Sequence, residues 1–524
     1  MLVAFGAVSV WVLGLDLWQV FVHGRHWTGT DGLFLTDQMQ YLAWISDASH
    51  HLLVSDLFVL RSTPADYFQP LVVISGAIAA LGVAPWVAFI LWQPVAVLAA
   101  FGAVRAYVRR SLAGRWERRA ALALALFFGS WGVLGDLWLP FLSWGYPFAL
   151  IAVVAMLGAL LLYDRARADL RVAWGPPLLG ALTSSLHPWQ GEEVILIVIG
   201  AEVLLRAGGS EPATRRLALP AATVIGTALP LAYLAILGRL DPAWRLARDA
   251  SHHTYSLTSI ALALAPLLVV AAFAYRGRPR SFLALATRAW PLAAVAVYVL
   301  SESSLSATPL HAFTGITIPL AVLGVEGVQR AGWGRVPARF ALAVLAVAAA
   351  TIPASEYELR VATYYAAPAT GNASFVSRSM VRALDYLKGD PEPGGVLTRA
   401  YLGVIVPGAT GRHTYEGGCQ WSQPRCPRRV IGARALLGDA MRPRAARAFV
   451  LGTTARFVLS GCNWGRNLAT ALAPITVSVH RFGCARVYQI TVESAGADSI
   501  GSSIEGSSRG GGSDAELPGR GGPR

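Results

Sequence analysis

Every long stretch of charge-free residues lies before Pro353, and every cysteine lies after it. The cysteines are Cys419, Cys426, Cys462 and Cys484. Disulfides form and persist outside the reducing cytoplasm, whereas a reduced thiol has no reason to avoid the apolar half of a chain. The distribution therefore predicts a membrane-embedded body followed by a cysteine-bearing domain on the extracytoplasmic side. Four free thiols are the alternative, because an even count alone is weak evidence.

The composition supports a membrane protein independently. Hydrophobic residues make up 55% of the chain and charged residues only 14%, whereas about 25% of a soluble domain is charged. A net charge of +14 would suggest a nucleic-acid partner for a soluble protein. Here many arginines lie in short connections between apolar segments, a pattern that indicates membrane orientation and argues against nucleic acid.

Apolar stretches long enough to cross a bilayer predict about eleven transmembrane helices. They lie near residues 1–22, 86–104, 120–138, 147–163, 172–187, 191–205, 217–237, 257–275, 283–300, 313–329 and 338–354. The basic connections are 105–119, 165–171, 206–216, 276–280 and 330–339, which the positive-inside rule assigns to the cytoplasm. We therefore expect a multi-pass protein of the cell membrane with a cytoplasmic N-terminus, and with everything after Pro353 outside.

Three regions follow from this topology. Residues 1–354 form a transmembrane module with a long first external loop at 23–69, residues 355–493 form the extracytoplasmic domain, and the Gly/Ser-rich tail at 494–524 is predicted to be disordered. Residues 70–84 are apolar, but as a helix they reach only about 22 Å. We expect them to be interfacial or half-inserted. The first segment lacks a basic n-region and a cleavage site, so we expect it to be retained.

The candidate site residues lie in the external loops. The first loop contains Asp31, Asp37, Gln38, Tyr41 and Arg61, and its stretch from Asp37 to Ile45 predicts a helix lying on the membrane. A second loop reads His187-Pro-Trp-Gln-Gly-Glu-Glu and supplies His187, Trp189 and Glu192; a third supplies Arg245, Arg248 and His252; a fourth contains Glu302 and His311. Ionisable groups at membrane depth are often functional, although at the interface each of them could be an ordinary solvated loop residue. No spacing among them matches a known metal-ligand motif, so a divalent cation is an option without a ligand set.

The layout resembles the GT-C superfamily of glycosyltransferases that use polyprenyl-phosphate-linked sugars, in particular protein O-mannosyltransferases and aminoarabinose transferases. In that family the helix of the first loop opens with Asp-Glu-x-x-Tyr, and Asp37-Gln38-Met39-Gln40-Tyr41 stands at this place. The family's His-Pro-Pro-Leu before a half-inserted segment is matched only by Gln69-Pro70-Leu71. After the membrane part, Thr410-Gly-Arg-His-Thr-Tyr-Glu-Gly-Gly resembles the external domain of bacterial members.

The resemblance implies an inverting membrane glycosyltransferase that moves a sugar from a polyprenyl-phosphate donor to a glycan, lipid or protein acceptor. Such an enzyme needs a carboxylate to accept the proton of the acceptor, and cationic or hydrogen-bonding groups for the phosphate. We predict Asp37 as the base, with Asp31 as the second candidate, and Arg61, Arg245 and Arg248 as phosphate-binding residues. The partners would be the lipid-linked donor and membrane lipids. The alternative role for Asp37 is to cap the loop helix.

The cysteine-bearing domain reads as a small α/β or α+β fold. Strands are predicted at 396–398, 457–460, 475–479 and 487–492, and helices at 380–387, 429–437 and 445–451. Four cysteines allow three connectivities. We favour Cys419–Cys426 and Cys462–Cys484, because each of these pairs can close locally.

Two other functions fit the same sequence. A transporter or flippase of a lipid-linked glycan would need charges near the bilayer midplane, and Asp16 and Asp136 are the candidates for such charges. A non-catalytic assembly protein would use the external domain to bind glycans. Turnover of a polyprenyl-linked sugar by the purified protein would separate the enzyme from both.

Overall fold

The computed structural model describes residues 1–31, 35–129, 137–169, 173–207, 217–252, 255–277, 279–302, 308–331, 356, 359–360, 363–364, 372–438 and 440–491. Met1–Ile490 forms one compact unit, and Thr491–Arg524 is separate from it. The predicted span at 338–354 and the whole predicted tail at 494–524 fall outside the described residues.

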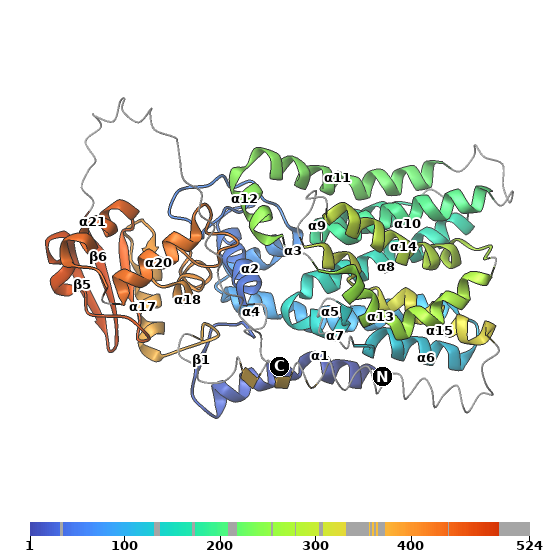
Figure 1. Ribbon diagram of the computed structural model, residues 1–524, viewed down its shortest axis with the longest axis horizontal. Coiled ribbons are helices and arrows are strands. Elements are labelled where there is room, and N and C mark those ends of the chain that lie inside the picture. Colours follow the sequence, from blue (N-terminus) through green and yellow to red (C-terminus); the bar gives the residue numbers. More distant parts are fainter. Residues whose placement is uncertain are drawn as a thin grey trace. The chain divides into compact units, whose positions relative to one another are not determined.

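The first part of the chain is helical (Figure 1). Its helices are Leu2–Phe21 (α1), Leu35–Ala48 (α2), Pro70–Ala80 (α3), Pro85–Ile90 (α4), Trp92–Ser111 (α5), Arg115–Phe127 (α6), Leu139–Gly145 (α7), Pro147–Ala168 (α8), Gly175–Leu186 (α9), Pro188–Ala207 (α10), Ala218–Leu240 (α11), Pro242–Ser251 (α12), Leu257–Ala272 (α13), Phe273–Arg276 (η2), Phe282–Leu300 (α14), Pro309–Phe313 (η4) and Thr317–Arg330 (α15). Proline opens several of them, because its fixed φ suits the first helical position and it has no N–H that would be left unpaired there.

Among the described residues, six helical segments are long and apolar enough to cross a membrane. They are Leu2–Phe21, Pro85–Ser111, Pro147–Ala168, Ala218–Leu240, Leu257–Arg276 and Phe282–Leu300. Helices also occupy the predicted spans at 172–187, 191–205 and 313–329 and the first part of the span at 120–138, but they are shorter or carry more charge. The count of eleven spans remains a prediction. As expected for 70–84, α3 is too short to span a bilayer.

Ion pairs join helix ends that border the basic connections. Arg110 at the end of α5 pairs with Asp164 of α8 at 3.0 Å, and Arg167 of α8 pairs with Glu202 of α10 at 2.8 Å. The end of α15 joins the start of α6, where the Gln329 side chain donates to Glu117 at 2.7 Å. The connections that the positive-inside rule assigns to one side of the membrane therefore meet at one end of the helical bundle.

The last part of the described chain carries a four-stranded sheet in the order β3-β4-β6-β5. Its strands are Val396–Leu397 (β3), Phe457–Ser460 (β4), Thr476–Phe482 (β5) and Ala485–Ile490 (β6), and its helices are Arg378–Gly389 (α17), Ala400–Gly403 (α18), Val406–Thr410 (α19), Cys426–Leu437 (α20), Pro443–Thr453 (α21), Ala469–Leu472 (α22) and Ala473–Ile475 (η5). β3 pairs with β4 in parallel, whereas the other pairs are antiparallel. All four predicted strands and all three predicted helices of this region are confirmed within a few residues.

The first external loop packs against this α/β part. His26–Trp27 (β1) pairs antiparallel with Phe375–Val376 (β2). One hydrophobic core contains Leu42 and Ile45 of α2 together with Leu402 and Val406, and α2 lies between the helices and the sheet in Figure 1. Because residues on both sides of 354 share this core, the predicted division at 354/355 remains a prediction.

The topology can be tested by labelling single cysteines. All native cysteines are disulfide-bonded, so an introduced thiol is the only reactive one. We expect the thiol of Asp249→Cys, at an exposed position of α12, to react with a membrane-impermeant maleimide on intact cells. The thiol of Arg165→Cys, at an exposed position near the end of α8, should react only after permeabilisation. The reverse pattern would overturn the assigned orientation.

Candidate functional site

The site is built around α2, the helix of the first external loop. Its sequence places apolar Met39, Leu42, Ala43 and Ile45 at helical spacing, and these residues are buried, at most 3% exposed. Contacts on both sides bury most of the remaining residues of α2 as well. Asp37 lies in the first helical turn and is half-buried. The predicted loop helix is thus confirmed, with its candidate base near its N-terminal end.

The carboxylate of Asp37 contacts the start of α8. The hydroxyl of Tyr146 donates a hydrogen bond to Asp37 Oδ2 at 2.5 Å. The ring of Tyr146 also packs edge-on against His311, with 6.1 Å between centroids. Tyr146 therefore connects the candidate base to the loop that precedes α15.

Two further predicted residues complete this cluster. The His311 ring lies 5.1 Å from the ring of His187 and 4.6 Å from that of Trp189. We call Asp37, Tyr146, His311, His187 and Trp189 the Asp37 cluster. Four stretches distant in the sequence contribute to it: α2, the start of α8, the α9–α10 turn and η4.

The hydrogen bonds around Gln190 fix the tautomer of His187. The Gln190 amide nitrogen donates to the carbonyl of His311 at 3.0 Å, so the amide oxygen must be the atom that accepts from His187 Nδ1. His187 Nδ1 therefore donates this hydrogen bond, and Nε2 is the second nitrogen of the ring. His187 itself is buried, at 7% exposure.

Asp31 and Gln38 form a second polar pair next to Asp37. The Gln38 amide donates to Asp31 Oδ2 at 3.0 Å and to the Trp144 carbonyl at 2.9 Å, while the Asp31 backbone N–H donates back to Gln38. Both side chains line a cleft that also contains Asp16 of α1 and Gln93 of α5. The sequence predicted Asp16 to lie at membrane depth, and the Asp16 side chain is buried, at 3% exposure.

Tyr41, the last residue of the Asp37–Tyr41 motif, packs among aromatic rings. Its ring stacks on Phe89 at 5.6 Å and meets Phe148 edge-on at 5.0 Å. Burial, and secondarily the charge of Asp37, raise the pKa of the Tyr41 hydroxyl. This tyrosine therefore stays neutral and anchors α2 to the helical bundle.

The predicted phosphate-binding arginines lie outside the Asp37 cluster. Arg61 is exposed and interacts electrostatically with Asp56 and Arg429. Arg245 and Arg248 lie on α12, where Arg248 pairs with neighbouring Asp249 at 3.1 Å. Among the described contacts, none joins these three arginines to Asp37. Glu192 and His252 are half-buried, in the first turns of α10 and at the end of α12.

Four aromatic rings connect α12 and the α/β part to α2. Trp244 of α12 lies 5.6 Å from Trp44 of α2 and 4.3 Å from Tyr67 of the first loop. Trp421 of the α/β part contacts Trp44 at 5.4 Å and Trp244 at 4.9 Å. The Trp421 indole N–H also donates to the side chain of Gln40 on α2.

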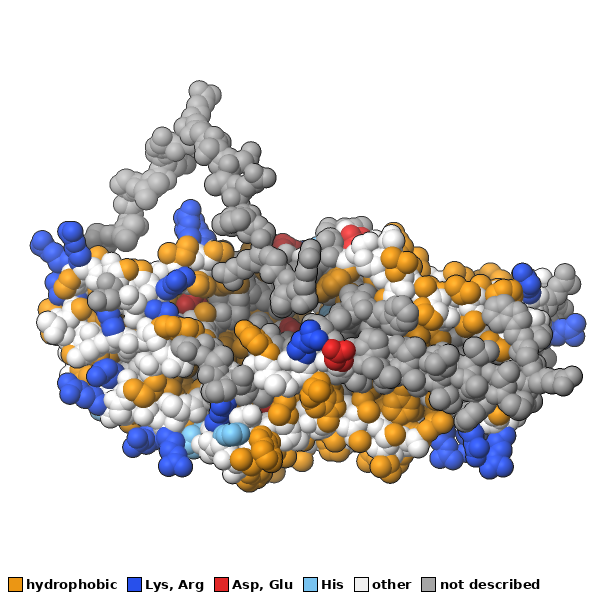
Figure 2. Space-filling view, turned by 60° about the horizontal axis from the view of Figure 1, so that its bottom comes forward, with side chains coloured by type: hydrophobic (Ala, Val, Ile, Leu, Met, Phe, Trp, Pro, Cys, Tyr) orange, Lys and Arg blue, Asp and Glu red, His pale blue; other side chains and the backbone are white. Residues whose placement is uncertain are grey.

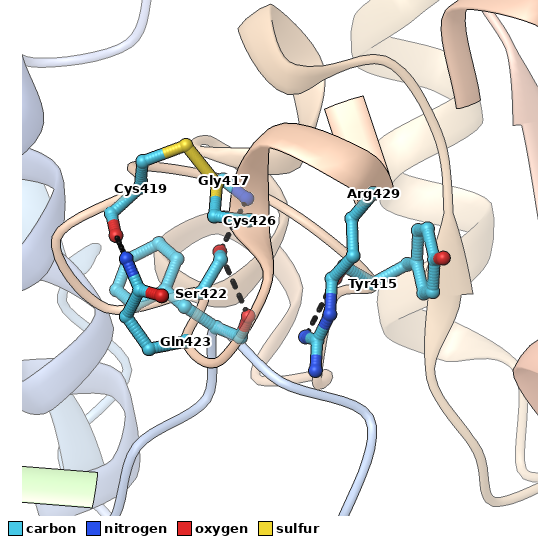
Figure 3. Close-up of a disulfide and its surroundings, with 8 residues drawn as sticks. Tyr415, Gly417, Cys419, Ser422, Gln423, Cys426 and Arg429 are labelled. Carbon is cyan, nitrogen blue, oxygen red and sulfur yellow. Dashed lines mark hydrogen bonds between the residues drawn. A yellow bond between two sulfur atoms is a disulfide. The ribbon is translucent and has the colours of Figure 1, made fainter. Parts of the chain in front are cut away.

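The loop that carries Trp421 is closed by a disulfide (Figure 3). Cys419–Cys426 has a Cα–Cα distance of 5.3 Å, and Cys462–Cys484 one of 4.9 Å, so both favoured pairings are confirmed. In the loop closed by Cys419–Cys426, the Ser422 hydroxyl donates to the carbonyl of Phe58 at 2.9 Å and accepts a hydrogen bond from the Gly417 N–H at 2.8 Å. The disulfide-closed loop is therefore hydrogen-bonded to the first external loop and to its own neighbouring residues.

Two buried carboxyl groups lie near this contact between the first external loop and the α/β part. Burial raises the pKa of Asp56 to about 7, although the backbone N–H of Phe58 and the charges of Arg61 and Arg429 oppose the shift. Burial likewise raises the pKa of Glu416 to about 7, against the charges of Arg399 and Arg429. Both groups therefore change charge near neutral pH.

The described residues offer no complete set of metal ligands. No group of three or more His, Cys, Asp or Glu side chains among them is arranged to hold an ion. A divalent cation therefore stays a prediction without an assigned set of ligands.

Sequence reasoning did not select Tyr146 or Gln190, and it noted His311 without assigning it a role. Tyr146 precedes Pro147 at the start of an apolar helix, which gives no local signal for function. His311 lies in the same short-loop setting as His187, and that shared setting was the available clue. The contact of Tyr146 with Asp37 and that of His311 with His187 each span more than a hundred positions in the sequence, whereas Gln190 contacts His187 three positions away.

Asp56 predicts a pH dependence of stability. The pKa of Asp56 is near 3.8 in the unfolded chain and about 7 in the folded protein, so its stabilising effect is complete below about pH 4 and is lost as the pH rises through about 7. Each pH unit between the two pKa values corresponds to about 1.4 kcal/mol. We expect the melting temperature of the purified protein to fall between about pH 5 and pH 8, and Asp56→Asn to reduce this fall. The part of the fall in melting temperature that is caused by Glu416 should remain.

Asp385→Asn, at an exposed position, is the control and should leave the pH profile unchanged. Asn at position 56 can still accept the hydrogen bond from the Phe58 N–H. An identical pH dependence in wild type and Asp56→Asn would contradict the assignment.

Comparison with known proteins gives the context of this geometry. No family model matches the sequence, and no curated protein matches it. Among solved structures, it is similar to the archaeal oligosaccharyltransferase AglB from Archaeoglobus fulgidus in complex with an inhibitory peptide and a dolichol-phosphate, with 15% identity and a TM-score of 0.53 over 95% of this chain and 74% of that chain. A complex of the Archaeoglobus fulgidus oligosaccharyltransferase with zinc and sulfate matches at 16% identity and a TM-score of 0.50, over 93% and 73%.

ArnT from Cupriavidus metallidurans bound to undecaprenyl phosphate matches at 15% identity and a TM-score of 0.50, over 94% of this chain and 98% of that one. Both neighbours are glycosyltransferases of the GT-C type, as the layout of the sequence suggested. At this level of identity the likeness concerns the fold, and the fold of this chain is that of GT-C membrane glycosyltransferases.

Proposed function

We propose that the protein is an inverting membrane glycosyltransferase that transfers a sugar from a polyprenyl-phosphate donor to an extracytoplasmic acceptor. The observation that carries the proposal is the position of Asp37 at the start of the loop helix α2, hydrogen-bonded to Tyr146 and clustered with His187 and Trp189. The GT-C fold supports it, because two proteins of this fold have been solved with dolichol-phosphate and undecaprenyl phosphate bound.

In the proposed reaction Asp37 acts as the general base. An acceptor hydroxyl attacks the anomeric carbon, its proton passes to the Asp37 carboxylate, and the bond from that carbon to the phosphate oxygen breaks with inversion. The polyprenyl phosphate leaves with the bonding electrons. The hydrogen bond from Tyr146 would hold the carboxylate in position, and Asp31 would orient Gln38 next to it.

We assign donor binding to the remaining predicted residues. His187 and Trp189 belong to the Asp37 cluster and would contact the sugar phosphate, with His187 Nε2 as the hydrogen-bonding atom. Arg245 and Arg248 are proposed for the phosphate because α12 is joined to α2 through Trp244 and Trp44. Glu192 and His252 are proposed for the edge of the same site, whereas Arg61, which lies near Asp56 and Arg429, is proposed for the donor phosphate on charge alone.

A transport function is the second candidate. Glu193 of α10 is fully buried and accepts a hydrogen bond from Trp290 of α14 at 2.8 Å. Buried carboxyl groups between helices often belong to ion or substrate pathways. Release of free polyprenyl phosphate, which transport alone does not produce, distinguishes the two functions.

The test of the base is Asp37→Asn. With a panel of undecaprenyl-phosphate-linked monosaccharides and a cell-envelope acceptor fraction, we expect wild type to release undecaprenyl phosphate and the variant to be slower by a factor of about 10² to 10⁴. Binding of undecaprenyl phosphate should persist in the variant, since the carboxylate acts on the acceptor. Parallel reactions with EDTA measure any dependence on a divalent cation.

Asp385→Asn, at an exposed position of α17, is the control and should retain full activity. Full turnover by Asp37→Asn would disprove its role as the base and transfer that role to Asp31. If wild type releases no undecaprenyl phosphate with any sugar of the panel, the proposed glycosyltransferase activity is contradicted.

The disulfide-closed loop gives a second test. Removing the bridge with Cys419→Ser and Cys426→Ser should cost about 2–4 kcal/mol of stability, and it should lower activity further because Trp421 loses its fixed position on α2. Gly418→Ala separates these effects. A Cβ at Gly418 would lie 2.4 Å from Thr36 Cγ2, next to Asp37, so we expect activity to fall while both disulfides remain.

Gly452→Ala is the control, since nothing lies within 4 Å of its added Cβ. Transfer rates and melting temperatures of all variants are compared. Unchanged turnover in both Gly418→Ala and the double serine variant would show that this loop does not position α2.

A further inference from the structure

The loop between β4 and α22 carries an exposed tryptophan in a strained backbone conformation. Trp464 is 49% exposed and has a φ of 54°. A large side chain rarely adopts positive φ, and such outliers persist where the surrounding structure enforces them. A tryptophan that only filled space would be buried, so its position calls for a different explanation.

The surrounding structure holds this loop tightly. The disulfide Cys462–Cys484 ties it to the turn between β5 and β6. The Tyr401 hydroxyl donates to the Asn463 carbonyl at 2.9 Å, and the Ser460 hydroxyl donates to the Arg466 carbonyl at 2.7 Å. These bonds fix both sides of Trp464. The indole ring is therefore presented to solvent on a rigid support.

The neighbours of the ring are polar and basic. Tyr401 meets the indole edge-on at 5.6 Å, and the Arg399 guanidinium lies 5.7 Å from the centroid of the indole. Arg399 Nε is buried and has no hydrogen-bond partner among the described residues. Partial burial lowers the pKa of Arg399, and nearby Arg434 adds to this shift, whereas Tyr401 and Glu416 oppose it.

The net charge of the α/β part also favours an anionic ligand. Residues 372–490 contain 16 Lys and Arg residues and 5 Asp and Glu residues, a net charge of +11 out of +14 for the chain. The positive charge is therefore not confined to the connections between membrane helices. Figure 2 shows basic side chains gathered on the part that carries the sheet, and apolar ones over much of the helical part.

We propose that Trp464, Tyr401 and Arg399 form a binding site for an acidic glycan, one that bears carboxylate or phosphate groups. The apolar face of a sugar ring packs on an exposed indole, and a guanidinium binds carboxylate or phosphate through paired hydrogen bonds. The inference rests on the proposed function in one respect, that the bound glycan is the acceptor of the transferred sugar.

A membrane surface fits these residues less well. A bilayer anchor needs several neighbouring apolar side chains, whereas Trp464 is flanked by Asn463, Gly465, Arg466 and Asn467. An aromatic ring beside polar amides and a cation offers a sugar both an apolar face and charged hydrogen-bond donors.

The test measures binding of an acidic oligogalacturonate and of its methyl ester, which has the same backbone without the charge. With the purified full chain in detergent, we expect wild type to bind the acid more tightly than the ester. Trp464→Ala should weaken binding of both at least tenfold. Arg399→Gln should weaken binding of the acid only, because the ester offers it no carboxylate.

Val477→Ala, at a position of β5 that is 61% exposed, is the control and should bind like wild type. Trp464→Phe keeps an aromatic ring and should retain most of the affinity even if Trp464→Ala is unstable. Equal binding by Trp464→Phe, Trp464→Ala and wild type would overturn the inference, and so would Trp464-dependent binding of anionic vesicles without binding of the glycan.

Asp37→Asn separates this inference from the proposed function. It should bind the acidic oligomer with wild-type affinity, since Asp37 does not contact this site. If wild type binds the glycan through Trp464 but transfers no sugar, the glycan site is supported and the proposed glycosyltransferase activity is contradicted. Transfer that is equally efficient in wild type and Trp464→Ala would contradict the acceptor site and leave the enzyme standing.

Discussion

The arrangement of the site depends on the packing of α2 between the helical bundle and the α/β part. Tyr41 fixes the helix on one side through Phe89 and Phe148, and Trp44 and Gln40 fix it on the other through Trp421. A short helix in water is barely stable alone, so its position comes from these tertiary contacts. Asp37 lies at its first turn, so any shift of α2 moves the carboxylate relative to Tyr146 and the Asp37 cluster.

The sequence was informative where a physical constraint acts locally. A bilayer requires long apolar helices, and the orientation rule grouped the arginine-rich connections that ion pairs such as Arg110–Asp164 and Arg167–Glu202 then join. Short stretches typical of strands located all four strands of the sheet, and local closure selected both disulfides. In each case nearby residues contain the signal, because the constraint concerns a single segment or two adjacent ones.

The site was predictable only in part, for a related reason. The motif from Asp37 to Tyr41 and the polar turn at His187 stand out in the sequence. Tyr146 does not, because its role arises only when α8 brings its hydroxyl to Asp37, 109 residues away in the chain. The arginines of the first and third loops were grouped with Asp37 by charge alone. Charge alone does not specify how far an arginine lies from Asp37, and in the folded protein Arg61 interacts with Asp56 and Arg429.

Basic charge has different physical consequences in the two parts of the chain. At the ends of the helices, arginines such as Arg110 and Arg167 pair with Asp164 and Glu202, so much of their charge is neutralised within the protein. In residues 372–490 acidic residues are too few to do so, and even buried Glu416 has its pKa raised to about 7. Uncompensated charge of this kind destabilises a folded structure through repulsion. An anionic ligand would relieve that repulsion, which links the basic composition of the α/β part to the rigid, exposed ring of Trp464 beside Arg399.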